Sequence, residues 1–151
     1  MNMKRHFCIL TLVVLLCLSG ACSQDARRRD DVTSFLQMGN KKVAAGDYRG
    51  AIKDYDEAIR MNPNEVEAYY NSGIVKKELC DYIGAIADYS RVIELNPNLA
   101  EAYINRGYAK YNLGNYKGEI IDYEKAIELN PSYRETLQRF IDYAKAKVMT
   151  R

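Results

Sequence analysis

The sequence predicts an all-α protein, a solenoid of three tandem helix-turn-helix repeats followed by a C-terminal capping helix. Proline, glycine and tyrosine recur at a spacing of 34 residues, and apolar residues within each repeat follow helical periodicity. No segment alternates apolar and polar residues as a half-buried strand would. The recurring residues are Pro63, Pro97 and Pro131; Gly39, Gly73 and Gly107; Tyr48, Tyr82 and Tyr116; and Tyr55, Tyr89 and Tyr123.

Each repeat is expected to hold two helices joined by a short turn. In the second repeat, residues 65–79 form the first helix, Cys80 and Asp81 the turn, and residues 82–95 the second helix. Pro97 ends the pair, because proline lacks a backbone donor and disfavours the helical conformation in the residue before it. The expected boundaries are 32–65, 66–99 and 100–133 for the repeats and 134–151 for the capping helix.

The capping helix is expected to be amphipathic. A solenoid needs an end cap with one polar face, because its last repeat otherwise exposes an apolar side. The basic residues of this segment should face solvent, and its apolar stripe should pack against the third repeat. That stripe comprises Leu137, Phe140, Ile141, Ala144 and Val148.

These features resemble the tetratricopeptide repeat. The family pattern has an apolar residue and glycine on the first helix, Gly-Asp/Asn-Tyr at the turn, small and aromatic residues on the second helix, and a closing proline. The resemblance covers residues 32–133 and implies a right-handed α-solenoid whose first helices line a concave groove for protein or peptide partners. The first repeat matches through Phe35, Met38, Gly39, Gly46, Asp47, Tyr48, Ala51, Tyr55, Ala58 and Pro63.

The resemblance also implies which side chains face the groove. They are mainly amides, which can donate and accept hydrogen bonds, and tyrosines, which offer rigid apolar area with a polar tip. A solvated helix face is the alternative interpretation of the amide row. The predicted peptide-binding residues are Gln37, Asn40, Tyr70, Asn71, Lys77, Asn105, Tyr108 and Tyr111.

Some family members grip the terminal carboxylate of a peptide with asparagine, lysine and arginine side chains. Asn40 and Asn71 match that pattern here. Leu36, Glu101 and Asn105 stand at the positions where the family has cations. Without those cations a carboxylate grip is disfavoured.

Glu119 departs from the repeat, because the equivalent residues are Ala51 and Ala85. A carboxylate between packed helices is costly unless it is paired. We expect either an ion pair with Lys110 or Arg106, or a local opening of the helix pair that keeps Glu119 in water.

The first 21 residues have the layout of a secretory signal peptide: a basic start, an apolar run over residues 7–18, and small residues. The run is shorter than the roughly 20 residues that span a bilayer. Leu18-Ser19-Gly20-Ala21-Cys22 resembles a bacterial lipobox, in which the cysteine is lipidated. This implies export and a lipid anchor at Cys22 on a bacterial cell membrane, facing the periplasm or the cell surface. Cleavage after Ala21 with simple secretion is the alternative.

Residues 22–31 are expected to be a polar tether between the lipid and the repeats. The segment contains Arg27, Arg28 and Arg29. These arginines either contact anionic head groups or belong to a solvated spacer.

Composition argues against an enzyme. His6 is the only histidine and lies in the signal, so the mature chain lacks the commonest general base and metal ligand. Removing Lys4 and Arg5 with the signal leaves 20 basic and 20 acidic residues, which gives no reason to expect nucleic acid. Cys80, the only cysteine after Cys22, has no activating neighbour in sequence and is expected to be inert.

The sequence therefore predicts a non-enzymatic scaffold that binds a protein or peptide, with no cofactor, catalytic residue, metal or small-molecule substrate. The alternative is a structural subunit that stacks through the edges of the solenoid.

Overall fold

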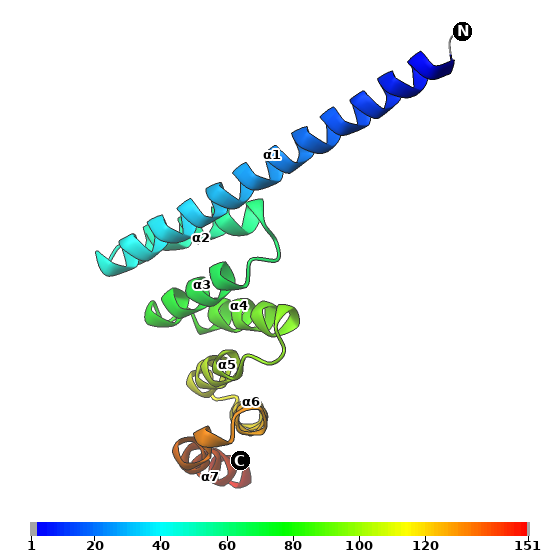
Figure 1. The fold of residues 1–151 in the computed structure, drawn as a ribbon. Helices are drawn as coiled ribbons and strands as arrows, with labels where there is room; N and C mark the ends of the chain where they lie inside the picture. The colour runs from blue at the N-terminus through cyan, green and yellow to red at the C-terminus, as the bar shows by residue number, and fades with distance from the viewer. Residues whose placement is uncertain (1–2, 151) are drawn as a thin grey trace.

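The computed structural model describes the backbone of residues 3–150 and the side chains of residues 24–150. Over this range the chain is a stack of helices without a strand, which confirms the predicted all-α solenoid (Figure 1). The elements are α1 (Met3–Ala44), α2 (Tyr48–Met61), α3 (Val66–Glu78), α4 (Tyr82–Leu95), α5 (Ala100–Asn112), α6 (Tyr116–Leu129), the 3-10 helix η1 (Pro131–Tyr133) and α7 (Arg134–Met149).

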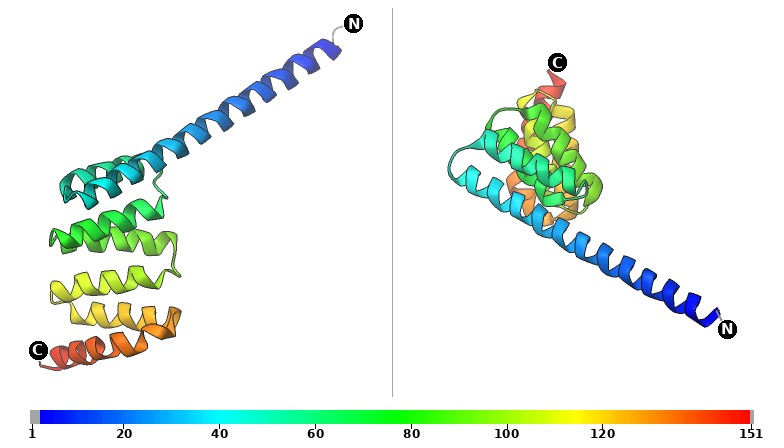
Figure 2. Two further views of the ribbon diagram at one scale, coloured as in Figure 1. Left: turned by 60° about the vertical axis from the view of Figure 1, so that its left-hand side comes forward. Right: turned by 90° about the horizontal axis from the view of Figure 1, so that it is seen from above.

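Helix pairs α1–α2, α3–α4 and α5–α6 lie one above another, and α7 packs on α6 at the end of the stack (Figure 2). Helices α3, α5 and α7 begin at Val66, Ala100 and Arg134. Each pair also packs on the next, through α2–α3 and α4–α5 contacts. The buried side chains form three hydrophobic clusters along the stack.

Helix α1 is much longer than the first helix of a repeat. Its C-terminal part packs on α2 through Val32, Leu36 and the half-buried Phe35, whereas its N-terminal part projects away from the stack (Figure 1). The predicted tether is thus helical here, and the side chains of residues 24–31 are exposed. The side chain of Cys22 lies outside the described residues. Among those that are described, no helix is long and apolar enough to cross a membrane.

In each repeat, a tyrosine ring of the second helix packs directly against the repeated glycine of the first helix. A Cβ atom on Gly39 would lie 2.5 Å from Cε1 of Tyr55, and one on Gly107 would lie 2.7 Å from Cε1 of Tyr123. Real atoms do not approach so closely, so any larger residue would push the ring away. Glycine and tyrosine therefore recur together because each repeat uses the same contact.

Each turn within a repeat has one residue in the left-handed conformation. Gly46 has a φ of 78° and Gly114 a φ of 70°, while Cys80 adopts a φ of 59° at the equivalent place. The next residue caps the second helix: the Asp81 side chain accepts a hydrogen bond from the Gly84 amide at 2.9 Å. Asp47 and Asn115 cap α2 and α6 in the same way.

An ion pair between a lysine and a buried aspartate joins the two helices of every repeat. The distances from lysine Nζ to the aspartate carboxylate are 2.7, 2.6 and 2.7 Å in repeats one, two and three. The 12-residue separation within each pair places both partners at the same height in the two antiparallel helices. The pairs are Lys42–Asp54, Lys76–Asp88 and Lys110–Asp122.

Candidate functional site

A cavity of about 770 Å³ opens between α5 and α7, with α6 as its floor. We call it the α5–α7 cavity. Its volume lies within the range of ligand-binding pockets. Its lining residues are Lys77, Ile104, Asn105, Tyr108, Tyr111, Glu119, Tyr123, Thr136, Leu137, Arg139, Phe140 and Tyr143.

The cavity exists because α5 and α7 pack against α6 but not against each other. No Cα atoms of these two helices lie within 8 Å. Only long side chains bridge the gap: the rings of Tyr111 and Tyr143 lie 6.3 Å apart between centroids. Tyr111 also meets Tyr116 edge-on at 6.0 Å, so the aromatic contact continues onto α6.

The walls of the cavity are exposed aromatic side chains. Tyr108, Phe140 and Tyr143 are 45, 44 and 47% exposed. Phe140 packs edge-on against Tyr123 at 6.2 Å between ring centroids. Aromatic side chains with a few polar groups among them are the usual lining of a ligand-binding cavity.

The position of Phe140 corrects the sequence prediction for the capping helix. Leu137, Ile141 and Ala144 are buried against the stack, as expected for the apolar stripe. Phe140 lies one residue before Ile141 and turns toward the cavity instead, because the stripe is narrower than predicted. Helix α7 thus has one face that caps the core and another that lines a pocket.

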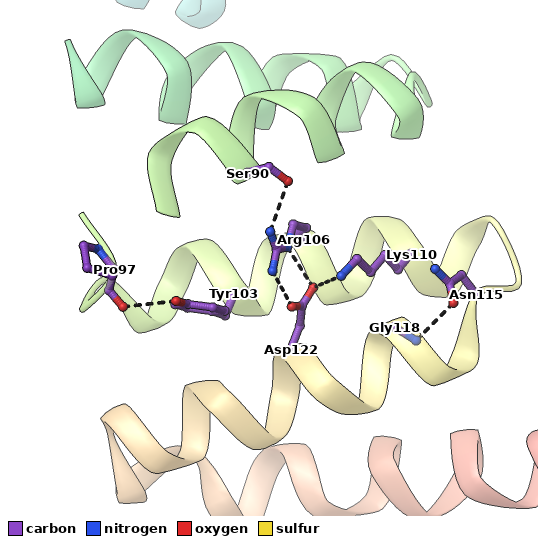
Figure 3. Close-up of polar contacts among 8 residues, drawn as sticks. All are labelled: Ser90, Pro97, Tyr103, Arg106, Lys110, Asn115, Gly118 and Asp122. Carbon is purple, nitrogen blue, oxygen red and sulfur yellow. Dashed lines mark hydrogen bonds and ion pairs between the residues drawn. The ribbon is translucent and has the colours of Figure 1, made fainter. Parts of the chain in front are cut away.

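Glu119 is the only acidic residue lining the cavity, and the structure contradicts both expectations for it. It is 1% exposed, so no local opening keeps it in water, and its Oε2 atom accepts no hydrogen bond from any described residue. Lys110 and Arg106, the predicted partners, instead bind Asp122, each at 2.7 Å (Figure 3). Arg106 also donates to Ser90 on α4 at 3.1 Å. Both cations are therefore held away from Glu119.

Burial without a partner changes the acidity of Glu119. Its pKa rises to about 7, because burial disfavours the ionised carboxylate. The pKa of the neighbouring Tyr123 is also raised, first by burial and then by the charge of Glu119. Near neutral pH, the Glu119 carboxyl is thus still partly protonated, whereas an ordinary surface glutamate is fully ionised.

The first two repeats use the predicted groove amides internally. Asn40 Oδ1 accepts hydrogen bonds from the Tyr55 hydroxyl at 2.7 Å and from Asn71 Nδ2 at 3.3 Å. Asn40 thus fixes the ring that lies over Gly39. The amide row at this end is partly structural rather than a free row of donors and acceptors.

A second internal contact joins the second and third repeats. Asn105 Nδ2 donates to the Tyr70 hydroxyl at 3.1 Å and to the Glu101 carbonyl at 3.0 Å. Tyr70 packs edge-on against Tyr89, with 6.0 Å between ring centroids. Glu101 accepts a hydrogen bond from the Tyr133 hydroxyl at 2.7 Å, and this bond lowers the pKa of Glu101. A carboxylate therefore occupies a clamp position where the family has a cation.

Four of the eight predicted groove residues line the cavity, namely Lys77, Asn105, Tyr108 and Tyr111. Gln37, Asn40, Tyr70 and Asn71 lie outside it. Among the cavity residues on α7, the sequence contained a signal for Arg139. This residue lies 34 residues after Asn105, which is a predicted groove residue. For Thr136, Phe140 and Tyr143 we find no such signal, because the repeat pattern does not continue at their positions.

Metal-ligating side chains and the free thiol of the described chain do not gather at this cavity. Within residues 24–150, no three histidine, cysteine, aspartate or glutamate side chains are grouped to hold a metal ion. Cys80 is free and exposed at the turn before α4, and Tyr82 donates to its Sγ at 3.7 Å.

Two family models match the chain. One is described as TPR repeat and covers residues 39–79 and 81–114, and the other is described as tetratricopeptide repeat and covers residues 100–133. Comparison with curated proteins by sequence found no match.

Many solved structures share the fold. The first TPR of Spaghetti (RPAP3) bound to HSP90 peptide SRMEEVD is 23% identical, with a TM-score of 0.73, over 80% of this chain and 94% of that one. The Arabidopsis OM64 TPR domain is 24% identical, with a TM-score of 0.72, over 79% of this chain and 98% of that one. MamA is 24% identical, with a TM-score of 0.66, over 80% of each chain. Since the family models together match well over half of its residues, this chain belongs to the tetratricopeptide repeat family.

Proposed function

We propose that this protein is a non-enzymatic scaffold that binds a segment of a partner protein in the α5–α7 cavity. The observation that carries the proposal is the group of exposed aromatic side chains, Tyr108, Phe140 and Tyr143, around an open cavity. Aromatic residues are the commonest source of binding energy at protein interfaces, because they bury a large rigid area.

The structural neighbours support a peptide as the occupant. The first RPAP3 domain is bound to an HSP90 peptide, and the second is in complex with an HSP70 peptide. Both of those peptides end in Glu-Glu-Val-Asp. The present chain has Glu101 at a clamp position, so we expect its partner to differ from those acidic ends.

Within the groove, we place binding at the C-terminal half. Asn40 already accepts hydrogen bonds from Tyr55 and Asn71, so a peptide there would have to replace internal hydrogen bonds. Tyr108 and Phe140 have exposed ring area that nothing within the described chain covers.

We further propose that the protein is exported and held on a bacterial membrane by lipid on Cys22. The support is the lipobox-like sequence of residues 18–22 behind a signal-like segment. In this arrangement, the exposed helical residues 24–31 would separate the lipid from the first repeat. The groove would then face partners that lie near, but not within, the membrane.

Crosslinking followed by co-purification from membranes tests the binding proposal. The variant Tyr108→Ala/Phe140→Ala removes two exposed rings from the cavity walls. The matched control is Ile83→Ala, because Ile83 is 73% exposed on α4 and does not line the cavity. We expect the double variant to lose partners that Ile83→Ala retains. Retention of every partner by the double variant would contradict the proposal.

Incorporation of labelled fatty acid tests the anchor. We expect label in the wild-type protein and in Cys80→Ala, which keeps the proposed lipid site. Cys22→Ala should carry none. An unlabelled wild type, or a labelled Cys22→Ala protein, would show that the anchor is not at Cys22.

A further inference from the structure

The floor of the α5–α7 cavity holds a buried acid that the fold itself does not use. Glu119 is 1% exposed, its Oε2 accepts no hydrogen bond within the described chain, and it lines the cavity. Repeats one and two have Ala51 and Ala85 at this position, both fully buried, so packing does not require a carboxylate. A buried carboxylate that costs stability, and whose Oε2 accepts no hydrogen bond within the described chain, suggests a role toward a ligand.

No cation of the described residues pairs with Glu119. Arg106 and Lys110 both bind Asp122, at 2.7 Å. Lys77 Nζ lies 5.7 Å from the centroid of the Tyr108 ring and forms an ion pair at 3.5 Å with a glutamate on its own helix.

Arg139 reaches over a ring rather than toward the floor. Its guanidinium carbon lies 5.5 Å from the centroid of Phe140. The side chain is exposed at the edge of the cavity. The acid therefore keeps an unmet demand for a positive charge or a hydrogen-bond donor.

The walls above Glu119 suit a cation with an apolar stem. Tyr108, Tyr111, Tyr123, Phe140 and Tyr143 all line the cavity. Aromatic faces attract ammonium and guanidinium groups and also pack against methylene chains. A carboxylate at the base with aromatic rings around it thus matches a long basic side chain in both charge and shape.

We propose that the α5–α7 cavity receives a lysine or arginine side chain of the partner polypeptide, with its cation on Glu119 and its methylene stem between the aromatic rings. This inference rests on the proposed function and names the chemistry of its partner. Lys77 and Arg139 at the edge would repel a second cation. The recognised segment should therefore have one basic residue with neutral or acidic neighbours.

Binding of two matched peptide pools tests the proposal. Both pools are biotinylated heptapeptides whose flanking positions vary among glycine, alanine, serine and glutamate. One pool has lysine at its centre, and the other has norleucine, which keeps the four-carbon stem and lacks the amine. Each pool is titrated at pH 8 against wild type, Glu119→Gln and Tyr108→Ala/Phe140→Ala.

We expect the wild type to bind the lysine pool at least tenfold more tightly than the norleucine pool. Glu119→Gln should bind the two pools equally, because it keeps the size of the side chain but not its charge. Glu119→Ala, which copies repeats one and two, should behave like Glu119→Gln. Tyr108→Ala/Phe140→Ala should weaken binding of both pools. These results together would support the proposal.

Equal binding of the pools by wild type, or a lysine preference that survives in Glu119→Gln, would overturn it. Failure of the wild type to bind both pools would also overturn it. The proposed function is judged separately, by whether native partners are lost from Tyr108→Ala/Phe140→Ala. Partners lost there but retained by Glu119→Gln would mean that the cavity binds protein without recognising a cation.

Discussion

Glu119 and Asp122 lie one helical turn apart on α6, and each is 1% exposed, yet Asp122 takes both neighbouring cations and Glu119 takes none. Asp122 belongs to the repeated ion pair between the two helices, and Arg106 adds a second cation to it (Figure 3). The carboxylate that holds the repeat together is thus satisfied within the fold. The carboxylate that faces the cavity is left for a partner.

The free energy of unfolding should fall as Glu119 ionises. Its pKa is raised from an ordinary value of 4.5 to about 7, so the folded state holds the proton more tightly than the unfolded state. The penalty is absent below pH 4.5, grows through pH 7 and is complete above it. Wild type should lose roughly 3 kcal/mol relative to Glu119→Ala between pH 4 and pH 8. Urea denaturation of both proteins at the two pH values measures this; parallel pH profiles would contradict it.

Binding of the lysine-centred pool should weaken as Glu119 becomes protonated. Since a cation binds the ionised form, affinity should fall by up to about tenfold per pH unit below pH 7. Glu119→Gln should show no such dependence between pH 5 and pH 8. Fluorescence anisotropy over that range measures it, and a slope shared by both proteins would assign the pH effect to another group. The other charged and titratable groups lining the cavity are Lys77, Tyr108, Tyr111, Tyr123, Arg139 and Tyr143.

Cys80→Gly should stabilise the protein by about 1 kcal/mol, because Cys80 adopts the left-handed conformation that costs an L-residue roughly that much. Gly114 occupies the equivalent turn, so Gly114→Ala is the matched reverse change and should destabilise by a similar amount. Chemical denaturation of both variants tests the pair. A loss of stability in Cys80→Gly would show that the thiol and its contact with Tyr82 matter more than the backbone.

Replacing the lysine of the repeated ion pair should cost more stability in the second repeat than in the third. Lys76→Met should cost roughly 2 kcal/mol, because Asp88 then keeps only the Ser72 hydroxyl, at 2.7 Å. Lys110→Met should cost clearly less, since Arg106 still binds Asp122. Denaturation midpoints of the two variants decide this. Equal costs would mean that Arg106 does not substitute for the lysine.

Substitutions on the two faces of α7 should have different effects, one mainly on stability and the other mainly on binding. Ile141 is 1% exposed, so Ile141→Ala should cost about 3 kcal/mol through a lost contact and a cavity. Phe140 is 44% exposed, so Phe140→Ala should cost less than about 1 kcal/mol while weakening partner capture. Thermal melts paired with co-purification report both effects. A large loss of stability in Phe140→Ala would place that ring in the core instead.

The architecture was predictable because its contacts repeat. The ring of Tyr55 over Gly39 and the ion pair of Lys42 with Asp54 each recur 34 and 68 residues later. A pattern present three times in the sequence is visible without coordinates. The lysines of these ion pairs recur at the same spacing as the aspartates, so the sequence also contained a signal for the pairs.

The candidate site was only half predictable. Lys77, Asn105, Tyr108 and Tyr111 follow from the position of first helices along a groove. Phe140 and Tyr143 do not, because they lie on a helix that the sequence presents as a cap. Their role depends on how α7 is rotated about its axis, and an amphipathic pattern sets that rotation only approximately.

The sequence by itself determined the repeat, its helices, its turns and the family, since these arise from contacts between neighbouring segments at a fixed spacing. It also showed Glu119 to be an exception. Only the tertiary structure decided what that exception means. Along the chain, Arg106 and Lys110 are each nearer to Glu119 than to Asp122, yet side-chain geometry sends both to Asp122. The packing of α5 and α7 on α6 leaves these two helices apart, which opens the cavity over Glu119.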